Sequence, residues 1–252
     1  MCILHHFFLS GERMPLQSYK IVRFSIHTQK VSPKKTTLFT LLWEVALNIF
    51  FPKFCISCRK IGSVLCEQCF EKIHFYTLPL PHSSETLFLD QLIAAGAYQP
   101  PLSTLITTFK YQSIRDIGTF LGRMLYHCID LPDTDIITAV PIHPKRMKAR
   151  GFNQAELIAQ EIAVLSDIQY EPLLIRIKHS KPQASLQQKS DRLTHLKNTF
   201  LVASSQEKKI KNSSILLIDD VTTTGTTLNS CAEVLKLAGA KEIIGLTVAH
   251  EG

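Results

Sequence analysis

A chain of 252 residues, of which 45% are hydrophobic and 19% charged, is long enough to bury the core of one medium-sized domain and a smaller unit. This composition is that of a globular protein and excludes a disordered or fibrous chain. Lys and Arg total 28 against 21 Asp and Glu, and the formal charge of +7 favours anionic partners such as phosphorylated sugars or nucleic acid. A merely basic globular protein is the alternative, because no interleaving of aromatic and basic residues predicts a surface that stacks bases.

The amino-terminal region carries no pattern to which a function can be assigned. We expect residues 1–36 to form an irregular extension, with Met14 as an alternative start of the natural chain. Residues 38–51 are the most membrane-like stretch, but they are few for a bilayer span and Glu44 interrupts them. We therefore expect a packed helix at this point, no transmembrane span and no signal peptide.

Two Cys-x-x-Cys pairs follow this stretch, with seven residues between them. Cys55 and Cys58 form the first pair, Cys66 and Cys69 form the second, and Gly62 allows the turn that brings the pairs together. Four thiolates at this spacing predict a structural Zn²⁺ site, which would leave no open metal position for catalysis. Two disulfides or a redox-active pair are the alternatives, and they are disfavoured because the chain has the features of a cytosolic protein.

From residue 91 onward, apolar runs alternate with helical stretches. Such alternation predicts an α/β domain with a parallel sheet flanked by helices. The expected strands are residues 92–98, 136–140, 173–177, 215–218 and 243–249, and the expected helices include 115–130 and 154–165. The domain organisation predicted in this way is an extension at 1–36, a helix with a zinc-binding segment at 37–90, and the α/β domain at 91–252.

A basic segment follows the predicted strand 136–140, at the end of a sheet where ligands bind in α/β proteins. Its cations, all within residues 141–154, are Lys145, Arg146, Lys148 and Arg150. Charge-assisted donors of this kind suit the oxygens of an anionic ligand, and a solvated basic loop is the alternative. The polar segment 178–192 is expected to be a surface loop, either a lid over the same site or a plain connector.

Residues 215–228 run from an apolar strand through two acids and a threonine-rich turn into a helix. Asp219 and Asp220 can accept hydrogen bonds from vicinal ribose hydroxyls. Gly225 permits a close turn, and a helix beginning near Thr226 directs unpaired N–H groups at an anion. The segment therefore predicts a sugar-phosphate site, with an ordinary capped strand-to-helix turn as the alternative. It is neither a Walker loop nor a dinucleotide fingerprint.

Several motifs together resemble the ComF family, and the likeness covers residues 38–249. They are Cys55-x-x-Cys58, Cys66-x-x-Cys69, Val140-Pro-Ile-His-Pro144, Arg150-Gly-Phe-Asn-Gln154, Gln183 with Arg192, and Asp219-Asp-Val-Thr-Thr-Thr-Gly-Thr226. The resemblance implies a small zinc-binding segment joined to a type I phosphoribosyltransferase-like domain, and a role in competence for DNA uptake. One position departs from the family pattern, which has Asn where this chain has His195.

The resemblance also assigns ligands to residues of this chain. The ligand would be 5-phosphoribosyl 1-pyrophosphate or a related sugar phosphate, with Mg²⁺ bound to this phosphoribosyl donor. Asp219 and Asp220 would hold the ribose as the catalytic pair, and Arg150 with its basic segment would face the pyrophosphate. The substrate-binding residues implied in this way are Val221, Thr222, Thr223, Thr224, Gly225, Thr226, Thr227, Arg150, Lys145 and Arg146.

Three functions are consistent with these features. The first is a phosphoribosyltransferase, of the glycosyltransferase class, whose acceptor the sequence does not identify. The second is a non-catalytic module that binds a nucleotide or nucleic acid and docks on DNA-uptake machinery, including its helicase, through the zinc segment. The third is a zinc-ribbon protein that binds single-stranded DNA through residues 38–90. In each case we expect a cytoplasmic protein, with peripheral attachment at the inner face of the membrane as a further option.

Overall fold

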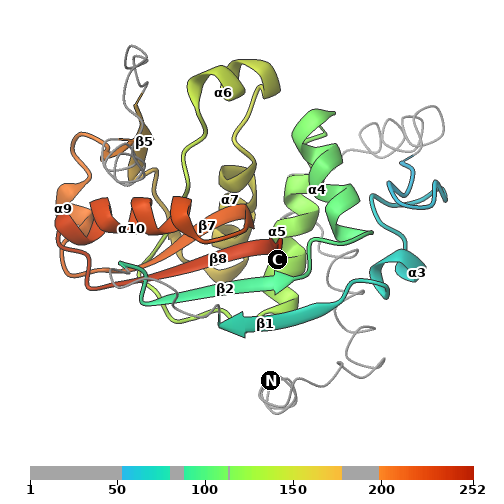
Figure 1. The fold of residues 1–252 in the computed structure, drawn as a ribbon, viewed down its shortest axis with the longest axis horizontal. Coiled ribbons are helices and arrows are strands. Elements are labelled where there is room, and N and C mark those ends of the chain that lie inside the picture. Colours follow the sequence, from blue (N-terminus) through green and yellow to red (C-terminus); the bar gives the residue numbers. More distant parts are fainter. Residues whose placement is uncertain (1–52, 80–87, 113, 178–198) are drawn as a thin grey trace, which may run out of the picture.

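A six-stranded sheet forms the centre of the part of the chain that the structure describes (Figure 1). Its strand order is β1-β2-β8-β7-β3-β4, in which β1 is antiparallel to β2 and the other neighbouring pairs are parallel. The computed structural model describes residues 53–79, 88–112, 114–177 and 199–252. The extension predicted at 1–36 and the helix predicted at 38–51 lie outside these ranges.

Helices connect the strands and cover both faces of this sheet. The strands are β1 Phe75–Pro79, β2 Gln91–Gly96, β3 Ile136–Ala139, β4 Gln169–Tyr170, β7 Ser214–Thr222 and β8 Glu242–His250. The helices of the described residues are α3 Glu67–Phe70, α4 Leu102–Tyr111, α5 Asp116–Cys128, α6 Pro144–Arg150, α7 Gln154–Ser166, α9 Glu207–Ile210 and α10 Thr226–Leu237. None of these helices has the length and apolar character needed to cross a bilayer.

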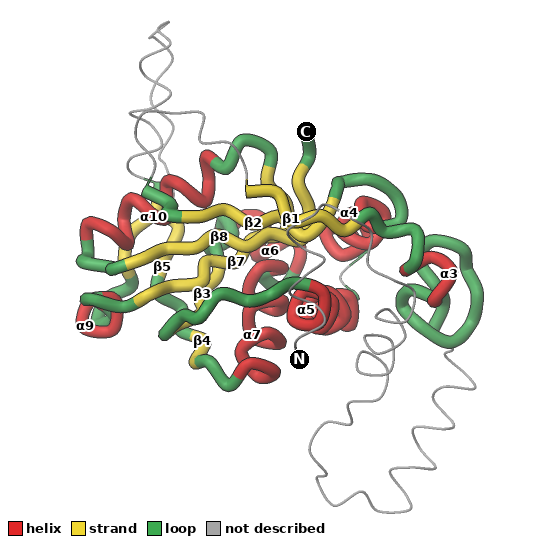
Figure 2. The backbone as a smooth tube through the Cα atoms, turned by 90° about the horizontal axis from the view of Figure 1, so that it is seen from below, coloured by secondary structure: helices red, strands yellow, loops and turns green. Residues whose placement is uncertain are grey.

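The sheet is buried on both faces, as expected for parallel strands with short and fully apolar sequences. Along β7, Leu216 and Ile218 belong to the same core cluster as the apolar faces of α4, α5 and α7, whereas Ile215 and Leu217 pack with α10. The side chains alternate because successive residues of a strand point to opposite faces. Figure 2 shows α5 and α7 on one side of the sheet and α10 on the other.

The predicted parallel sheet flanked by helices is confirmed, but one expected strand lies elsewhere. Residues 173–177 were expected in the parallel sheet, whereas β5 Leu174–Arg176 pairs with β6 Phe200–Val202 in a separate antiparallel sheet. The two-residue strand β4 already occupies the position beside β3, so the next extended segment takes another partner. The sequence patterns did not indicate β1 or α4, which add an antiparallel edge and a helix before α5.

The strand β3 ends beside Ile218 of β7, and this register positions the site. Ala139 lies opposite Ile218, and the N–H of Val140 donates to the carbonyl of Ile218 at 2.9 Å. Because both strands run in the same direction, the segment that leaves the sheet after β3 lies beside the acids of β7, which stay in the sheet. The carboxyl ends of the strands are where ligands bind in open α/β sheets.

Candidate functional site

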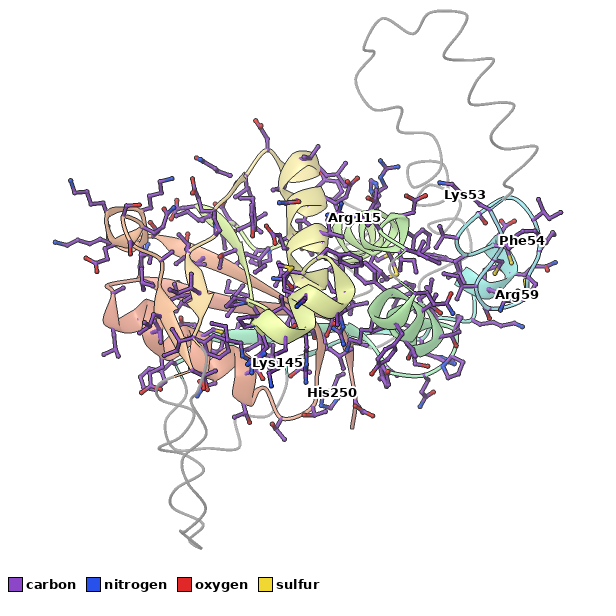
Figure 3. All side chains as sticks on the ribbon, turned by 90° about the horizontal axis from the view of Figure 1, so that it is seen from above. Lys53, Phe54, Arg59, Arg115, Lys145 and His250 are labelled. Atoms are coloured by element: carbon purple, nitrogen blue, oxygen red, sulfur yellow. The ribbon has the colours of Figure 1, made fainter. Side chains whose placement is uncertain are left out.

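A cavity of about 340 Å³ lies where β3 and β7 end. It brings the predicted acids together with two of the predicted arginines and with further polar side chains. The lining residues used below are Lys110, Arg146, Arg150, Gln154, Arg176, Asp219, Asp220 and Thr227. Lys145, which the sequence assigned to the ligand, is exposed on α6 outside this lining (Figure 3).

The two acids lie within β7 and not in the turn that follows. β7 extends to Thr222, beyond the predicted end of this strand at Ile218. The N–H of Asp220 donates to Oδ1 of Asp219 at 2.8 Å. Burial, and after it the charge of Asp220, raise the pKa of Asp219 to about 7, against the opposing effects of the Asp220 N–H, Lys110 and Arg176. The pair therefore favours any partner that donates hydrogen bonds or carries positive charge.

The threonine turn after β7 is preformed. Gly225 has a φ of +73°, and a Cβ at this position would lie 3.0 Å from Cδ2 of Leu92, so both conformation and space favour glycine. Oγ1 of the buried Thr222 accepts from the N–H of Gly225 at 3.0 Å. The hydroxyls of Thr224 and Thr226 are 2.6 Å apart. The first N–H groups of α10 have no acceptor inside the helix, so the turn offers donors to an anion.

The end of β8 supports this turn from the other side. Nε2 of His250 lies 2.9 Å from the carbonyl oxygen of Thr223, to which its N–H donates. One residue further, the N–H of Glu251 donates to the carbonyl of Thr222 at 2.9 Å. His250 is labelled in Figure 3. Together the two hydrogen bonds connect the threonine turn to the end of β8.

The basic segment after β3 forms the short helix α6, which the sequence patterns did not indicate. Pro144 occupies the first helical position, where no N–H is needed. Nδ1 of His143 accepts from the N–H of Lys145 at 3.2 Å, and Gly151, with a φ of +79°, ends the helix. No side chain of α6 is buried, so its cations stand outside the core, where Arg146 and Arg150 line the cavity.

Two buried residues hold α6 at its carboxyl-terminal side. Nδ2 of Asn153 donates to the carbonyl of Val140 at 3.0 Å, which closes the segment into a loop with fixed ends. Phe152 is buried, and its ring stacks on Phe109 of α4 with centroids 5.3 Å apart. The position of the basic helix is therefore set by the core and by one buried hydrogen bond.

Arg150 and Gln154 form a pair at the wall of the cavity. Nη1 of Arg150 donates to Oε1 of Gln154 at 3.1 Å, and the guanidinium carbon lies 5.7 Å from the ring centroid of Tyr111. The Gln154 side chain is 2% exposed, and its Nε2 has no hydrogen-bond partner. Because buried donors are nearly always satisfied, an unpaired amide at the wall of the cavity is unusual.

Two cations that no motif indicated complete the lining. Nζ of Lys110, in the last turn of α4, lies 3.1 Å from Oδ1 of Asp220. Arg176 ends β5 with its guanidinium carbon 5.2 Å from the ring centroid of Phe200, and burial followed by the charge of Arg146 lowers its pKa. The sequence patterns did not indicate α4, and they placed β5 in the parallel sheet. No signal in the sequence therefore linked Lys110 or Arg176 to the acids.

The four predicted cysteine ligands come together in the zinc segment, residues 53–74. The Sγ atoms of Cys55, Cys58, Cys66 and Cys69 all lie within 4.8 Å of one another. A tetrahedral zinc ion with Zn–S bonds of about 2.3 Å needs sulfurs about 3.8 Å apart. All four residues are free thiols, so the arrangement is that of a metal site and not of two disulfides. The donor set and its closeness fit a structural Zn²⁺.

Burial and nearby N–H groups set the pKa values of these thiols when no metal is bound. Burial raises the pKa of Cys66, and it raises the pKa of Cys69 to about 12. Burial acts in the same direction on Cys55, but the N–H groups of Cys66, Cys58 and Ser57 outweigh it and lower the pKa to about 6. A cation among the sulfurs would hold all four as thiolates, which is the form that binds zinc.

Comparison with known proteins agrees with this arrangement. The phosphoribosyl transferase domain family matches residues 148–252, which contain β7, its acids and α10. Competence protein F of Haemophilus influenzae is 34% identical over 213 residues, which cover 78% of this chain and 90% of that protein. The chain belongs to the ComF family. A second relative of this ComF protein is the DNA utilization protein YhgH of Escherichia coli, which is 28% identical over 75% of this chain and 85% of that protein. A third is competence protein ComFC of Bacillus subtilis, which is 26% identical over 73% of this chain and 78% of that protein.

The resemblance drawn from the sequence is thereby confirmed, together with the phosphoribosyltransferase-type domain and the four-cysteine cluster. Two residues that contributed to the resemblance, Gln183 and Arg192, lie outside the described residues, as does the whole polar segment 178–192. His195, which departs from the family pattern, lies outside them as well.

Loss of one cysteine ligand should remove zinc from this ComF protein and lower its stability. Cys66 is buried in the same core cluster as Leu65 and Phe70, so Cys66→Ser should abolish stoichiometric zinc and lower the melting temperature by several degrees. Elemental analysis and calorimetry measure the two quantities. The control is Cys128→Ser, which alters a buried thiol of the same core that is not one of the four cysteine ligands, and this variant should keep its zinc. Full zinc content in Cys66→Ser would contradict the assignment.

Replacement of Asp219 by Asn should make stability less sensitive to pH. The pKa of Asp219 rises from 3.8 to about 7, so between these values the folded protein holds a proton that the unfolded chain has released, and stability falls as the pH rises. Asp219→Asn cannot ionise, so its melting temperature relative to the wild type should increase steadily across this range. Calorimetry measures both melting temperatures. A difference between variant and wild type that stays constant or decreases as the pH rises would show that the pKa of Asp219 is not raised in the folded protein.

Proposed function

We propose that this ComF-family protein binds 5-phosphoribosyl 1-pyrophosphate, or a closely related sugar phosphate, and transfers its phosphoribosyl group. The observation that carries the proposal is the meeting, around one cavity, of two carboxylates, four cationic side chains and Thr227 of the first turn of α10. Residues 222–226 of the threonine turn lie outside this lining. A phosphoribosyl donor has the matching chemistry, because it combines vicinal hydroxyls with a 5-phosphate and a pyrophosphate.

Each part of the donor has a matching part of the site. The ribose hydroxyls would donate to Asp219 and Asp220, and the 5-phosphate would accept from the N–H groups and hydroxyls of residues 223–227. The pyrophosphate would lie against Arg146 and Arg150, whose guanidinium groups make charge-assisted hydrogen bonds. This orientation sets the leaving group beside α6 and leaves the other face of the ribose to an acceptor.

In the transfer, the bond between C1 of the ribose and the pyrophosphate oxygen breaks, and its electron pair leaves with the pyrophosphate. A lone pair of the acceptor forms the new bond to C1 from the opposite face, and the acceptor loses a proton to solvent. Asp219 and Asp220 would orient the ring and offset the positive charge that develops on it. Mg²⁺, held chiefly by the donor's own oxygens, would supply further positive charge near the leaving group.

The names of the relatives suggest where such a protein acts, since they refer to competence and to DNA utilization. We therefore place this chain in the handling of incoming DNA. It would work in the cytoplasm or at the inner face of the membrane, with DNA-uptake machinery, including its helicase, docked on the zinc segment. The transferred phosphoribosyl group would then meet an acceptor that a panel of nucleobases, nucleotides and amines can identify.

Removal of both acids should abolish donor binding and leave the fold intact. Asp219→Asn with Asp220→Asn deletes the acceptors for the ribose hydroxyls, so calorimetric affinity for 5-phosphoribosyl 1-pyrophosphate should fall below detection. The control variant, Asp133→Asn with Glu207→Gln, removes the same number of charges at two exposed positions and should bind normally. Unchanged affinity in the first variant would sink the assignment, and pyrophosphate release with the acceptor panel tests turnover.

A second candidate function, binding of single-stranded nucleic acid, is supported by a basic and aromatic group on the zinc segment. Phe54 is 48% exposed between Lys53 and the cysteine pair, and Arg59 follows that pair (Figure 3). Phe54, Arg59 and Ile114 line a cavity of about 500 Å³ between this segment and the helices α4 and α5. An exposed ring beside cations is the combination on which bases stack.

Phe54→Ala should weaken the affinity for a labelled oligothymidine by about tenfold, the scale expected when one base loses its stacking partner. Arg59→Ala should weaken it as well and reduce its salt dependence. Fluorescence anisotropy measures both effects. Leu237→Ala, which changes an 80% exposed side chain on α10, is the control. Equal affinity of all four proteins would remove this candidate.

A further inference from the structure

Lys110 is the cation nearest to the catalytic pair, and it comes from outside the matched transferase domain. Its Nζ lies 3.1 Å from Oδ1 of Asp220. The two side chains are 21% and 14% exposed, so the ion pair is shielded from solvent for most of its surface. Ion pairs in such places are screened far less by salt than exposed ones.

The position of Lys110 is set by the core. Four apolar residues on one face of α4 are fully buried, and these are Leu102, Leu105, Ile106 and Phe109. Phe109 also stacks on Phe152, which follows α6. Lys110 is therefore held between a buried aromatic contact and the cavity, and the ammonium reaches Asp220 because its helix cannot turn about its own axis.

The charges around the cavity already favour an anion. Four cationic side chains line it, namely Lys110, Arg146, Arg150 and Arg176, against the two acids. The buried Nε2 of Gln154 adds a donor without a partner. A divalent cation that entered with an anionic ligand would be repelled by these four cations. Its electrostatic attraction to the site would therefore be weaker than at a site lined by carboxylates alone.

We propose that Lys110 is a cation built into this site, which allows a phosphoribosyl donor to bind with only a weak requirement for magnesium. The inference rests on the proposed function and states how the same cavity balances charge. The ammonium has three N–H donors, so Lys110 can stay beside Asp220 and also donate to the oxygens of the donor. Asp220 thereby keeps a counter-ion when the ribose hydroxyls arrive.

Calorimetric binding of 5-phosphoribosyl 1-pyrophosphate, with and without magnesium, tests this proposal. The magnesium-free buffer is prepared with a metal-binding resin and contains no chelator, so that the zinc site is left intact. For the wild type, Kd in the two buffers should agree within about tenfold. For Lys110→Ala, omission of magnesium should weaken binding by at least a further tenfold, the scale of one lost charge-assisted hydrogen bond.

Three variants make the result specific. Lys110→Met keeps the apolar stem and should behave as Lys110→Ala does, whereas Lys110→Arg keeps the charge and should behave as the wild type does. Lys208→Ala removes an exposed lysine of α9 and should leave both values of Kd unchanged. Melting temperatures establish that each variant is folded.

The outcomes separate this inference from the proposed function. A wild type that binds the donor only with magnesium, or a Lys110→Ala variant that weakens equally in both buffers, overturns the role of Lys110 and leaves donor binding standing. A wild type that binds in neither buffer overturns the proposed function, and the inference falls with it.

Discussion

Partial burial of two adjacent carboxylates at the end of a strand is unfavourable unless cations or hydrogen-bond donors surround them. Asp219 and Asp220 are in this position because β7 continues in the sheet to Thr222 and carries both acids with it. Repulsion between them, added to burial, raises the pKa of Asp219 to about 7. Three neighbouring elements, α4, α6 and β5, offset this cost because each contributes at least one cationic side chain to the same cavity.

Those positive groups are placed by apolar packing and not by their own charges. Lys110 follows the buried face of α4, and α6 is fixed where Phe152 stacks on Phe109 and Asn153 bonds to the strand end. The zinc segment belongs to the same core, since the ring of Phe70 meets that of Phe120 on α5. A structural metal would therefore stabilise the side of the molecule from which α4 reaches the acids. Rigid elements of this kind hold a site more accurately than loops do.

Local sequence was sufficient wherever the feature is itself local. The strand, acids, glycine turn and helix of residues 215–228 follow one another in the chain, and the two cysteine pairs are close in sequence, so both could be predicted. Lys110 and Arg176 could not, because their partnership with the acids exists only after α4 and β5 have packed. Pro144 and Gly151 are local signals for α6, because proline suits the first turn of a helix and glycine suits its end. The partner of β5 could not be predicted either, because it depends on the two-residue strand β4 occupying the position beside β3.

Amide hydrogen exchange of the protein, measured with and without 5-phosphoribosyl 1-pyrophosphate, tests the central claim most directly. It reports where the donor binds and needs no knowledge of the acceptor. The account predicts slower exchange in two segments that are distant in sequence, the start of α10 with its threonine turn and the α6 segment that begins at Val140. The N–H groups of the first are the proposed phosphate donors. Protection confined to the zinc segment, or none in the presence of saturating donor, would contradict the claim that β3 and β7 end in a phosphoribosyl site.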